Sequence, residues 1–257
     1  MKSKLLTSLF AIASGAIAVL AFSPFGYWPL VIPSLLGLYA LLDKATPKQA
    51  AWRGFGYAMG LFLPGQWWIH VSMTEFGGIP LPAAFVLLAG LCAYLSLYPT
   101  LACWLFARFF AGRHWSRWLL AFPALWLMAD WLRGWVMTGY PWLWFGYTQI
   151  DGPLKGFAPL LGVQGITLAL LLTASALWLV WQHRKPAWLL LPVALVGAAQ
   201  GLMQLNWVTR GEPVKVALVQ GNIEQSLKWD PEALVPTVRK YQDLSRENQD
   251  ADIIVWP

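Results

Sequence analysis

Seven long apolar segments dominate this chain of 257 residues. An α-helix rises about 1.5 Å per residue, so about 20 apolar residues cross the roughly 30 Å core of a bilayer. Charged residues make up only 12% of the chain, about half the share in a soluble domain. The pattern predicts a polytopic α-helical membrane bundle of about seven helices and excludes an ordinary soluble enzyme. The candidate spans are Leu5–Phe22, Trp28–Leu42, Phe55–Val71, Leu81–Phe110, Leu119–Trp135, Leu160–Trp181 and Trp188–Val208.

Several of these spans carry irregularities. Pro64 and Gly65 lie inside the third span and predict a kink there. The fourth span is too long for a perpendicular helix, so we expect it to tilt or to leave the membrane near Pro99. The first span follows Lys2 and Lys4 and could instead be a cleaved signal peptide.

The Lys and Arg residues predict the orientation of the bundle. If the N-terminus lies in the cytoplasm, ten Lys and Arg residues fall on the inner side of the membrane. Only two, Arg133 and Lys155, fall in the outer loops that precede the end of the seventh span. The net charge of +6 therefore reflects topology, and we expect no nucleic-acid partner. Tryptophans near span ends, such as Trp67, Trp68 and Trp118, are predicted to be interfacial anchors.

The composition changes after residue 210. Eight of the twelve acidic residues lie between Glu212 and Asp252. Val214–Val219 and Ile253–Trp256 read as strands, and a helix between them is predicted to begin at Asp230 and Pro231. Apolar strands around a helix predict a parallel sheet on the outer side. We expect residues 1–210 to form the bundle and residues 211–257, too few to fold alone, to begin a larger α/β domain.

Two loops are candidates for lipid contact. Thr138–Gln149 holds five aromatic residues and no charge, and it is too broken by Gly and Pro to span the membrane. Trp229 is a lone aromatic residue in a polar loop, which suits packing against an acyl chain. Asp130 and Arg133 lie near the outer end of the fifth span, where they are either functional or a plain i,i+3 ion pair.

Reactive groups are scarce in the sequence. Cys92 and Cys103 lie in apolar sequence, eleven residues apart, and are predicted to be inert core thiols. His70 and Glu75 have a spacing similar to that of glycerolipid acyltransferases, but an interfacial polar pair is the better interpretation. No metal-ligand cluster and no phosphate-binding Gly loop is present, so we expect no metal and no cofactor.

The sequence resembles the apolipoprotein N-acyltransferases, bacterial inner-membrane enzymes that N-acylate lipoproteins. The segments that carry the resemblance are Leu20–Trp28, Leu132–Trp135, Thr138–Lys155, Val219–Asp230 and Ile253–Pro257. The resemblance implies a membrane bundle followed by a periplasmic nitrilase-like α-β-β-α domain. It implies a monomer whose partners are a phospholipid acyl donor and a diacylglyceryl-Cys lipoprotein acceptor.

The implied reaction is a ping-pong transfer through a Cys thioester, with a Glu as general base and a Lys stabilising the oxyanion. In the family the Glu follows the Ile-Val-Trp-Pro strand end, which here is Ile254–Pro257, and the Lys and Cys come later. The triad is therefore expected after Pro257, and residues 1–257 alone are expected to be inactive. The resemblance assigns Trp229 and Trp142 to the substrate side of the site.

Arg133, Tyr147 and Gln225 lie in matching motifs and complete the predicted substrate-binding residues. The main alternative is a short, non-catalytic membrane relative that retains the bundle. A channel or transporter is a weaker alternative, because mid-span ionisable residues and repeated broken helices would then be expected.

Overall fold

The computed structural model describes residues 2–112, 114–209, 211–228 and 230–257. It divides into two compact units, residues 1–205 and residues 206–257. The helices and strands are α1 (Lys2–Val19), α2 (Val31–Leu42), α3 (Pro47–Gly65), α4 (Ile69–Val71), α5 (Leu81–Phe109), α6 (Phe122–Arg133), α7 (Ala158–His183), α8 (Leu190–Leu202), β1 (Val216–Leu218), α9 (Pro231–Arg246) and β2 (Ile253–Val255).

Short helical turns connect these elements. They are η1 (Trp28–Leu30), η2 (Ser72–Phe76), η3 (Arg117–Ala121), η4 (Val136–Thr138), η5 (Phe145–Gln149), η6 (Lys155–Phe157), η7 (Pro186–Leu189) and η8 (Gln225–Leu227). The turns η4 to η6 lie in the segment between α6 and α7, which holds the predicted aromatic loop.

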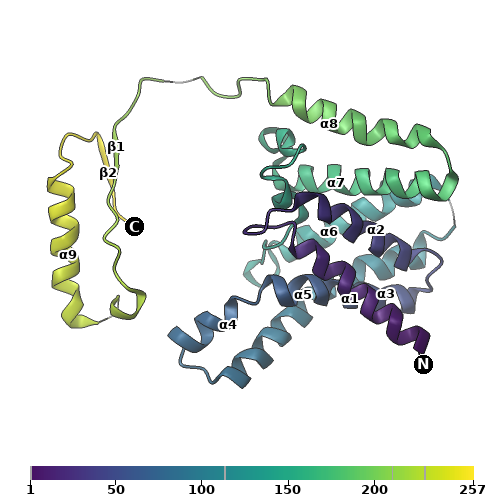
Figure 1. Ribbon diagram of the computed structural model, residues 1–257, viewed down its shortest axis with the longest axis horizontal. Helices are drawn as coiled ribbons and strands as arrows, with labels where there is room; N and C mark the ends of the chain where they lie inside the picture. The colour runs from purple at the N-terminus through teal and green to yellow at the C-terminus, as the bar shows by residue number, and fades with distance from the viewer. Residues whose placement is uncertain (1, 113, 210, 229) are drawn as a thin grey trace. The chain divides into compact units, whose positions relative to one another are not determined.

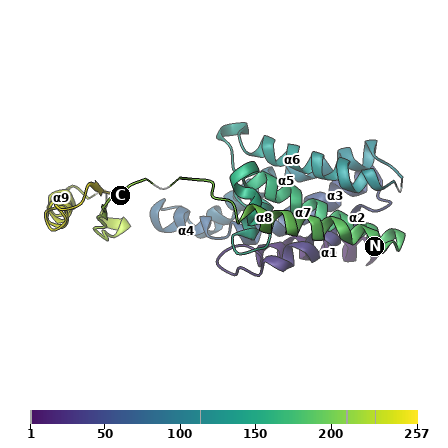
Figure 2. The same cartoon turned by 90° about the horizontal axis from the view of Figure 1, so that it is seen from above.

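The long helices of the first unit lie alongside one another as a bundle (Figures 1 and 2). Helix α3 packs against both α1 and α5, and its start is fixed by a capping box between Thr46 and Gln49 with Pro47 in the first turn. The main core joins α2, α5, α6 and α7 around a cluster of rings. Tyr39 lies 4.8 Å from Phe122 and 5.0 Å from Trp118, centroid to centroid.

The outer face of the bundle is strongly apolar, as a lipid-facing surface requires. Val86, Leu190 and Val193 are 71%, 71% and 68% exposed. In the part of the chain that the structure describes, two helices, Leu81–Phe109 and Lys155–His183, are long and apolar enough to cross a bilayer. Three shorter apolar helices, Lys4–Val19, Trp28–Leu42 and Pro186–Leu202, accompany them. The helical membrane character is thus supported, while the count of seven spans stays a prediction.

The structure corrects two details of the bundle. The predicted irregularity at Pro64 and Gly65 is present, but it is a helix end and not a kink, because α3 ends at Gly65 and does not continue to Val71. Helix α5 runs unbroken through Pro99, so of the two alternatives for this long span only the tilt stays a prediction. Trp118 is fully buried among aromatic rings and is therefore not an interfacial anchor.

The second unit contains the predicted strand, helix and strand. Strands β1 and β2 pair in parallel, with Val216 opposite Ile253 and Leu218 opposite Val255, which confirms the predicted parallel pairing. The Asp230 carboxylate accepts a hydrogen bond from the Glu232 amide, which confirms the predicted start of α9. Helix α9 packs on the strands through Tyr241, whose ring lies 5.3 Å from that of Trp256.

Candidate functional site: an apolar cavity at one end of the bundle

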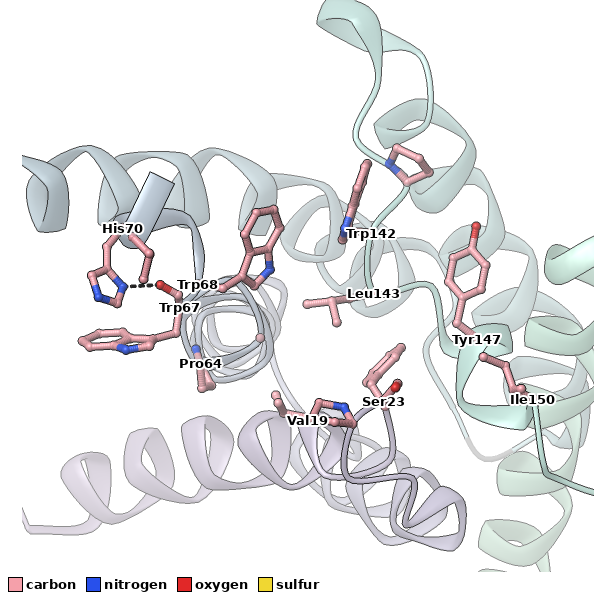
Figure 3. A pocket seen from close by; sticks show the side chains of 15 residues that line it. Val19, Ser23, Pro64, Trp67, Trp68, His70, Trp142, Leu143, Tyr147 and Ile150 are labelled. Atoms are coloured by element: carbon pink, nitrogen blue, oxygen red, sulfur yellow. Dashed lines mark hydrogen bonds between the residues drawn. The ribbon is translucent and has the colours of Figure 1, made fainter. Parts of the chain in front are cut away.

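An apolar cavity lies inside the first unit, where α1 and α3 end and the aromatic loop begins. Its volume is about 900 Å³, within the range of small-molecule sites. The lining residues come from three segments: the end of α1 and the turn after it, with Val19, Phe22, Ser23 and Pro24; the end of α3 and the residues after it, with Pro64, Gly65, Trp67, Trp68, His70 and Val71; and the loop, with Pro141, Trp142, Leu143, Tyr147 and Ile150. Figure 3 shows the α3 residues on one side, the loop residues on the other, and Val19 and Ser23 between them.

The end of α3 forms one wall because the helix stops at Gly65. The chain then makes a turn that presents Trp67 and Trp68, which are about half exposed. The His70 Nδ1 atom donates a hydrogen bond to the Trp67 carbonyl oxygen (Figure 3), which orients the imidazole against the indole. Among the described residues no hydrogen bond joins His70 to the exposed Glu75, which lies in η2, so the acyltransferase-like pairing gains no support.

The loop that forms the opposite wall is held to the bundle from behind. The ring of Phe145 is buried and stacks on Trp126 of α6 at 5.4 Å. The Gly146 amide donates to Thr167 Oγ1 of α7 at 3.0 Å. A Cβ atom at Gly146 would lie 2.1 Å from the Val163 carbonyl oxygen, so only glycine allows this contact. The loop is thus anchored while Trp142 and Tyr147, 51% and 42% exposed, face the cavity.

Tyr140 ties the same loop to α3. Its hydroxyl donates to Gln66 Oε1 at 2.7 Å, and Gln66 is fully buried. Burial, together with the nearby Cys92 side chain, raises the pKa of Tyr140 to about 12 against the lowering effect of Arg133. The phenol is therefore neutral at physiological pH and available as a donor.

Arg133 lies behind the loop and not in the cavity. It is 2% exposed, and its guanidinium binds Asp130 Oδ1 at 3.0 Å and the carbonyl oxygens of Tyr140 and Trp142 at 2.8 Å and 2.6 Å. The predicted i,i+3 ion pair with Asp130 is confirmed. A direct contact between Arg133 and a substrate stays a prediction.

The remaining predicted residues lie elsewhere. Gln225 is in the second unit, where it lines a pocket of about 430 Å³ with Gln220, Asn222 and Tyr241. Trp229 lies outside the described residues. Cys92 and Cys103 are both buried free thiols, which confirms the prediction that they belong to the core. No cluster of metal-binding side chains occurs within the described ranges.

Sequence reasoning missed the α3 side of the cavity. Trp67 and Trp68 are predicted to be interfacial anchors, but they line the cavity together with Pro64 and His70. The usable signal is the Pro64–Gly65 pair, which precedes the two tryptophans by one residue, because a helix that stops there can turn both side chains toward its neighbours.

Comparison with known proteins gives the family. Residues 14–176 match the family described as the apolipoprotein N-acyltransferase N-terminal domain, and this match covers more than half of the chain. The chain belongs to the apolipoprotein N-acyltransferase family. The resemblance of its motifs is thereby confirmed.

Curated relatives named apolipoprotein N-acyltransferase agree with this. The protein of Vibrio parahaemolyticus serotype O3:K6 is 50% identical over 245 residues, 95% of this chain and 48% of the relative. That of Vibrio cholerae serotype O1 is 46% identical over 259 residues, 100% of this chain and 51% of the relative. That of Pseudomonas putida is 42% identical over 266 residues, which cover 97% of this chain and 51% of the relative. The chain spans about half the length of the curated relatives it matches.

Proposed function

We propose that the protein transfers an acyl chain from a phospholipid to the N-terminal α-amine of diacylglyceryl-Cys lipoproteins, the last step of their maturation. The chain described here supplies the membrane bundle and the lipid-side wall of the site. Family membership supports the reaction class. The observation that carries the assignment to this part of the chain is the cavity walled by Trp67, Trp68, Trp142 and Leu143.

The chemistry of the cavity suits an acyl chain. Its walls are mostly aliphatic and aromatic, with His70, Ser23 and Tyr147 as the principal polar side chains. Each methylene removed from water contributes about 0.8 kcal/mol, so a long chain gains binding energy without any specific polar contact. A few polar groups at the rim are then enough to orient the ester end of the lipid.

We propose that the reactive groups lie outside the half of the relatives' length that this chain spans. We propose that the Glu-Lys-Cys triad follows Pro257 and forms the thioester in a ping-pong cycle. Cys92 and Cys103 are buried within α5 and are poorly placed to attack a lipid ester. The alternative remains a short, non-catalytic relative that kept the lipid cavity, and it predicts no acyl transfer by the native protein.

The surroundings of the cavity fit this proposal. We place the N-terminus in the cytoplasm of a bacterial inner membrane, which puts the ends of α1 and α3 and the aromatic loop on the periplasmic side. Residues after about 210 are then periplasmic, and the parallel pair of β1 and β2 with α9 begins a nitrilase-like domain. A monomer is sufficient, because one chain forms all walls of the cavity.

The test is acyl transfer by the full-length protein in lipid nanodiscs. The donor is a phosphatidylethanolamine with a labelled acyl chain, the acceptor is a diacylglyceryl-Cys peptide, and the N-acylated product is measured by mass spectrometry. Absence of product from the wild-type protein would reject the proposal and favour the non-catalytic alternative.

A filling substitution tests the role of the cavity. Val71 lines it, so Val71→Trp should lower kcat/KM for a long-chain donor by roughly tenfold and for a short-chain donor by less. Val86→Trp is the matched control, because Val86 is 71% exposed on α5 and does not line the cavity. Equal losses in the two variants would show that the cavity does not hold the chain.

A further inference from the structure

The loop that walls the cavity has a strained backbone. Met137, Thr138 and Leu143 have φ angles of 52°, 75° and 61°, in the left-handed region that L-residues rarely adopt. Gly139 has a φ of 83°, and a Cβ atom there would lie 2.0 Å from the Gly134 carbonyl oxygen. Such conformations persist only where the surrounding structure holds them. The question is which contacts hold this loop.

Arg133 provides the central contacts. Its Nη1 atom donates to the carbonyl oxygens of Tyr140 and Trp142, and its Nη2 atom donates to Asp130. The guanidinium also lies over the Phe62 ring of α3, 5.1 Å from its centroid. A planar fork with several donors can bind two carbonyls and a carboxylate at once, whereas a lysine ammonium on its flexible stem matches this geometry poorly.

These contacts hold the loop in one position against the end of α3. Leu143 follows Trp142 directly, and its Cδ1 atom would lie 2.5 Å from a Cβ atom at Gly65. Leu143 therefore packs on the bare backbone at the end of α3, where it forms part of the cavity wall (Figure 3). The bonds from Arg133 to the carbonyl oxygens of residues 140 and 142 hold the stretch of backbone that carries Trp142 and Leu143.

We propose that Arg133, oriented by Asp130, is a positioning residue that sets the shape of the acyl-chain cavity through the loop backbone. This inference rests on the proposed function for its substrate. Arg133 acts through Trp142 and Leu143 and does not touch the lipid, because it is buried and both of its terminal nitrogens bind protein oxygens. A residue that served stability alone would change the amount of folded protein but not the affinity for the donor.

The bundle contains a matched control. Arg117, at the start of η3, is also buried, binds the carbonyl oxygens of Gly112 and Leu42 at 2.9 Å and 3.4 Å, and lies 4.5 Å from the Phe106 ring centroid. It does not line the cavity. Arg133→Lys and Arg117→Lys therefore remove the same kind of contact at two places, only one of which touches the loop.

The experiment uses the full-length protein in nanodiscs and two readouts. Hydrogen–deuterium exchange is followed by mass spectrometry for peptides covering residues 136–150. The KM for phosphatidylethanolamine and kcat are measured on folded, monodisperse protein. For Arg133→Lys we expect faster exchange in residues 136–150 and a KM raised by roughly tenfold, with a smaller change in kcat. For Arg117→Lys we expect unchanged exchange there and an unchanged KM.

Several results would overturn the inference. Exchange in residues 136–150 that matches the wild type would show that Arg133 does not hold the loop. A KM that stays at the wild-type value, or rises equally in Arg117→Lys, would show a purely structural role.

If Arg133→Lys does not accumulate as folded protein, Asp130→Asn is the second variant. It keeps one acceptor for Nη2 but removes the charge, so we expect a smaller change in both the exchange rate and the KM. Absence of transfer by the wild type rejects the proposed function, whereas the exchange readout still decides whether Arg133 holds the loop.

Discussion

Individual side chains in the loop after α6 decide what the cavity can bind. Tyr140 shows how a single polar group is used there. Its hydroxyl donates to the buried Gln66 side chain, so the phenol links the loop to the end of α3 and remains neutral. Ionisation would place a negative charge next to the side-chain oxygen of Gln66, Oε1, at a poorly hydrated position. The contact is therefore expected to fail at high pH.

This gives a prediction for the titration of Tyr140. The pKa of Tyr140 is raised from 10.0 to about 12, so its contribution to stability is complete below pH 10 and is lost as the pH rises through 12. The tyrosinate absorbance of the wild type minus that of Tyr140→Phe should develop near pH 12. A difference spectrum with its midpoint near pH 10 would contradict the buried contact.

At the scale of elements, α1 and α3 pack closely, backbone against backbone. A Cβ atom at Gly60 would lie 2.1 Å from the Ile12 carbonyl oxygen, and one at Gly15 would lie 1.9 Å from the Tyr57 carbonyl oxygen. The two backbones therefore touch, as small residues allow in membrane bundles. Ser34 of α2 adds a polar contact by donating to the Ser14 carbonyl oxygen at 2.6 Å.

Gly60→Ala should separate these helices. The added methyl group has no space, so we expect a loss of about 2 kcal/mol in the free energy of unfolding, measured by denaturation in mild detergent. Gly90→Ala is the matched control, because a Cβ atom at Gly90 on α5 meets nothing within 4 Å. It should be neutral, or stabilising by up to about 1 kcal/mol from helix propensity. Equal destabilisation of both variants would argue against the close approach.

For the whole molecule, the central question is which side of the membrane each unit occupies. The exposed apolar residues of the bundle favour contact with lipid, whereas the charged residues within 212–252 favour contact with water. We place the second unit in the periplasm because the basic residues of the bundle gather at the opposite ends of the helices from the cavity. Lys48 and Glu247 are exposed residues on the two predicted sides.

Cysteine labelling in intact spheroplasts tests this placement. Glu247→Cys should react with a membrane-impermeant maleimide, whereas Lys48→Cys should react only after permeabilisation. Cys92 and Cys103 are buried and should contribute little background, whereas the Cys of the proposed triad is replaced by Ala in the parent protein before either variant is made. Labelling of Lys48→Cys in intact spheroplasts would reverse the proposed orientation.

The sequence by itself determined the features that depend on local pattern. The long apolar runs predict the helical membrane character, and the sequence motifs are enough to indicate the family. The pair Asp230–Pro231 predicted where α9 starts, because capping and the fixed φ of proline act within one turn. The apolar strands around it predicted the parallel pairing of β1 with β2.

Only the tertiary structure decided how residues distant in sequence combine. Pro64 lies in the last turn of α3, whereas Pro99 lies inside α5 and the helix continues past it, so the presence of a proline does not by itself decide where a helix ends. Trp118 is buried and Trp67 lines the cavity, although the same interfacial role was predicted for both. The sequence pairs Arg133 only with Asp130, whereas its bonds to the carbonyl oxygens of Tyr140 and Trp142 exist because the loop folds back onto it. Contacts of this kind depend on packing between elements, which local pattern does not encode.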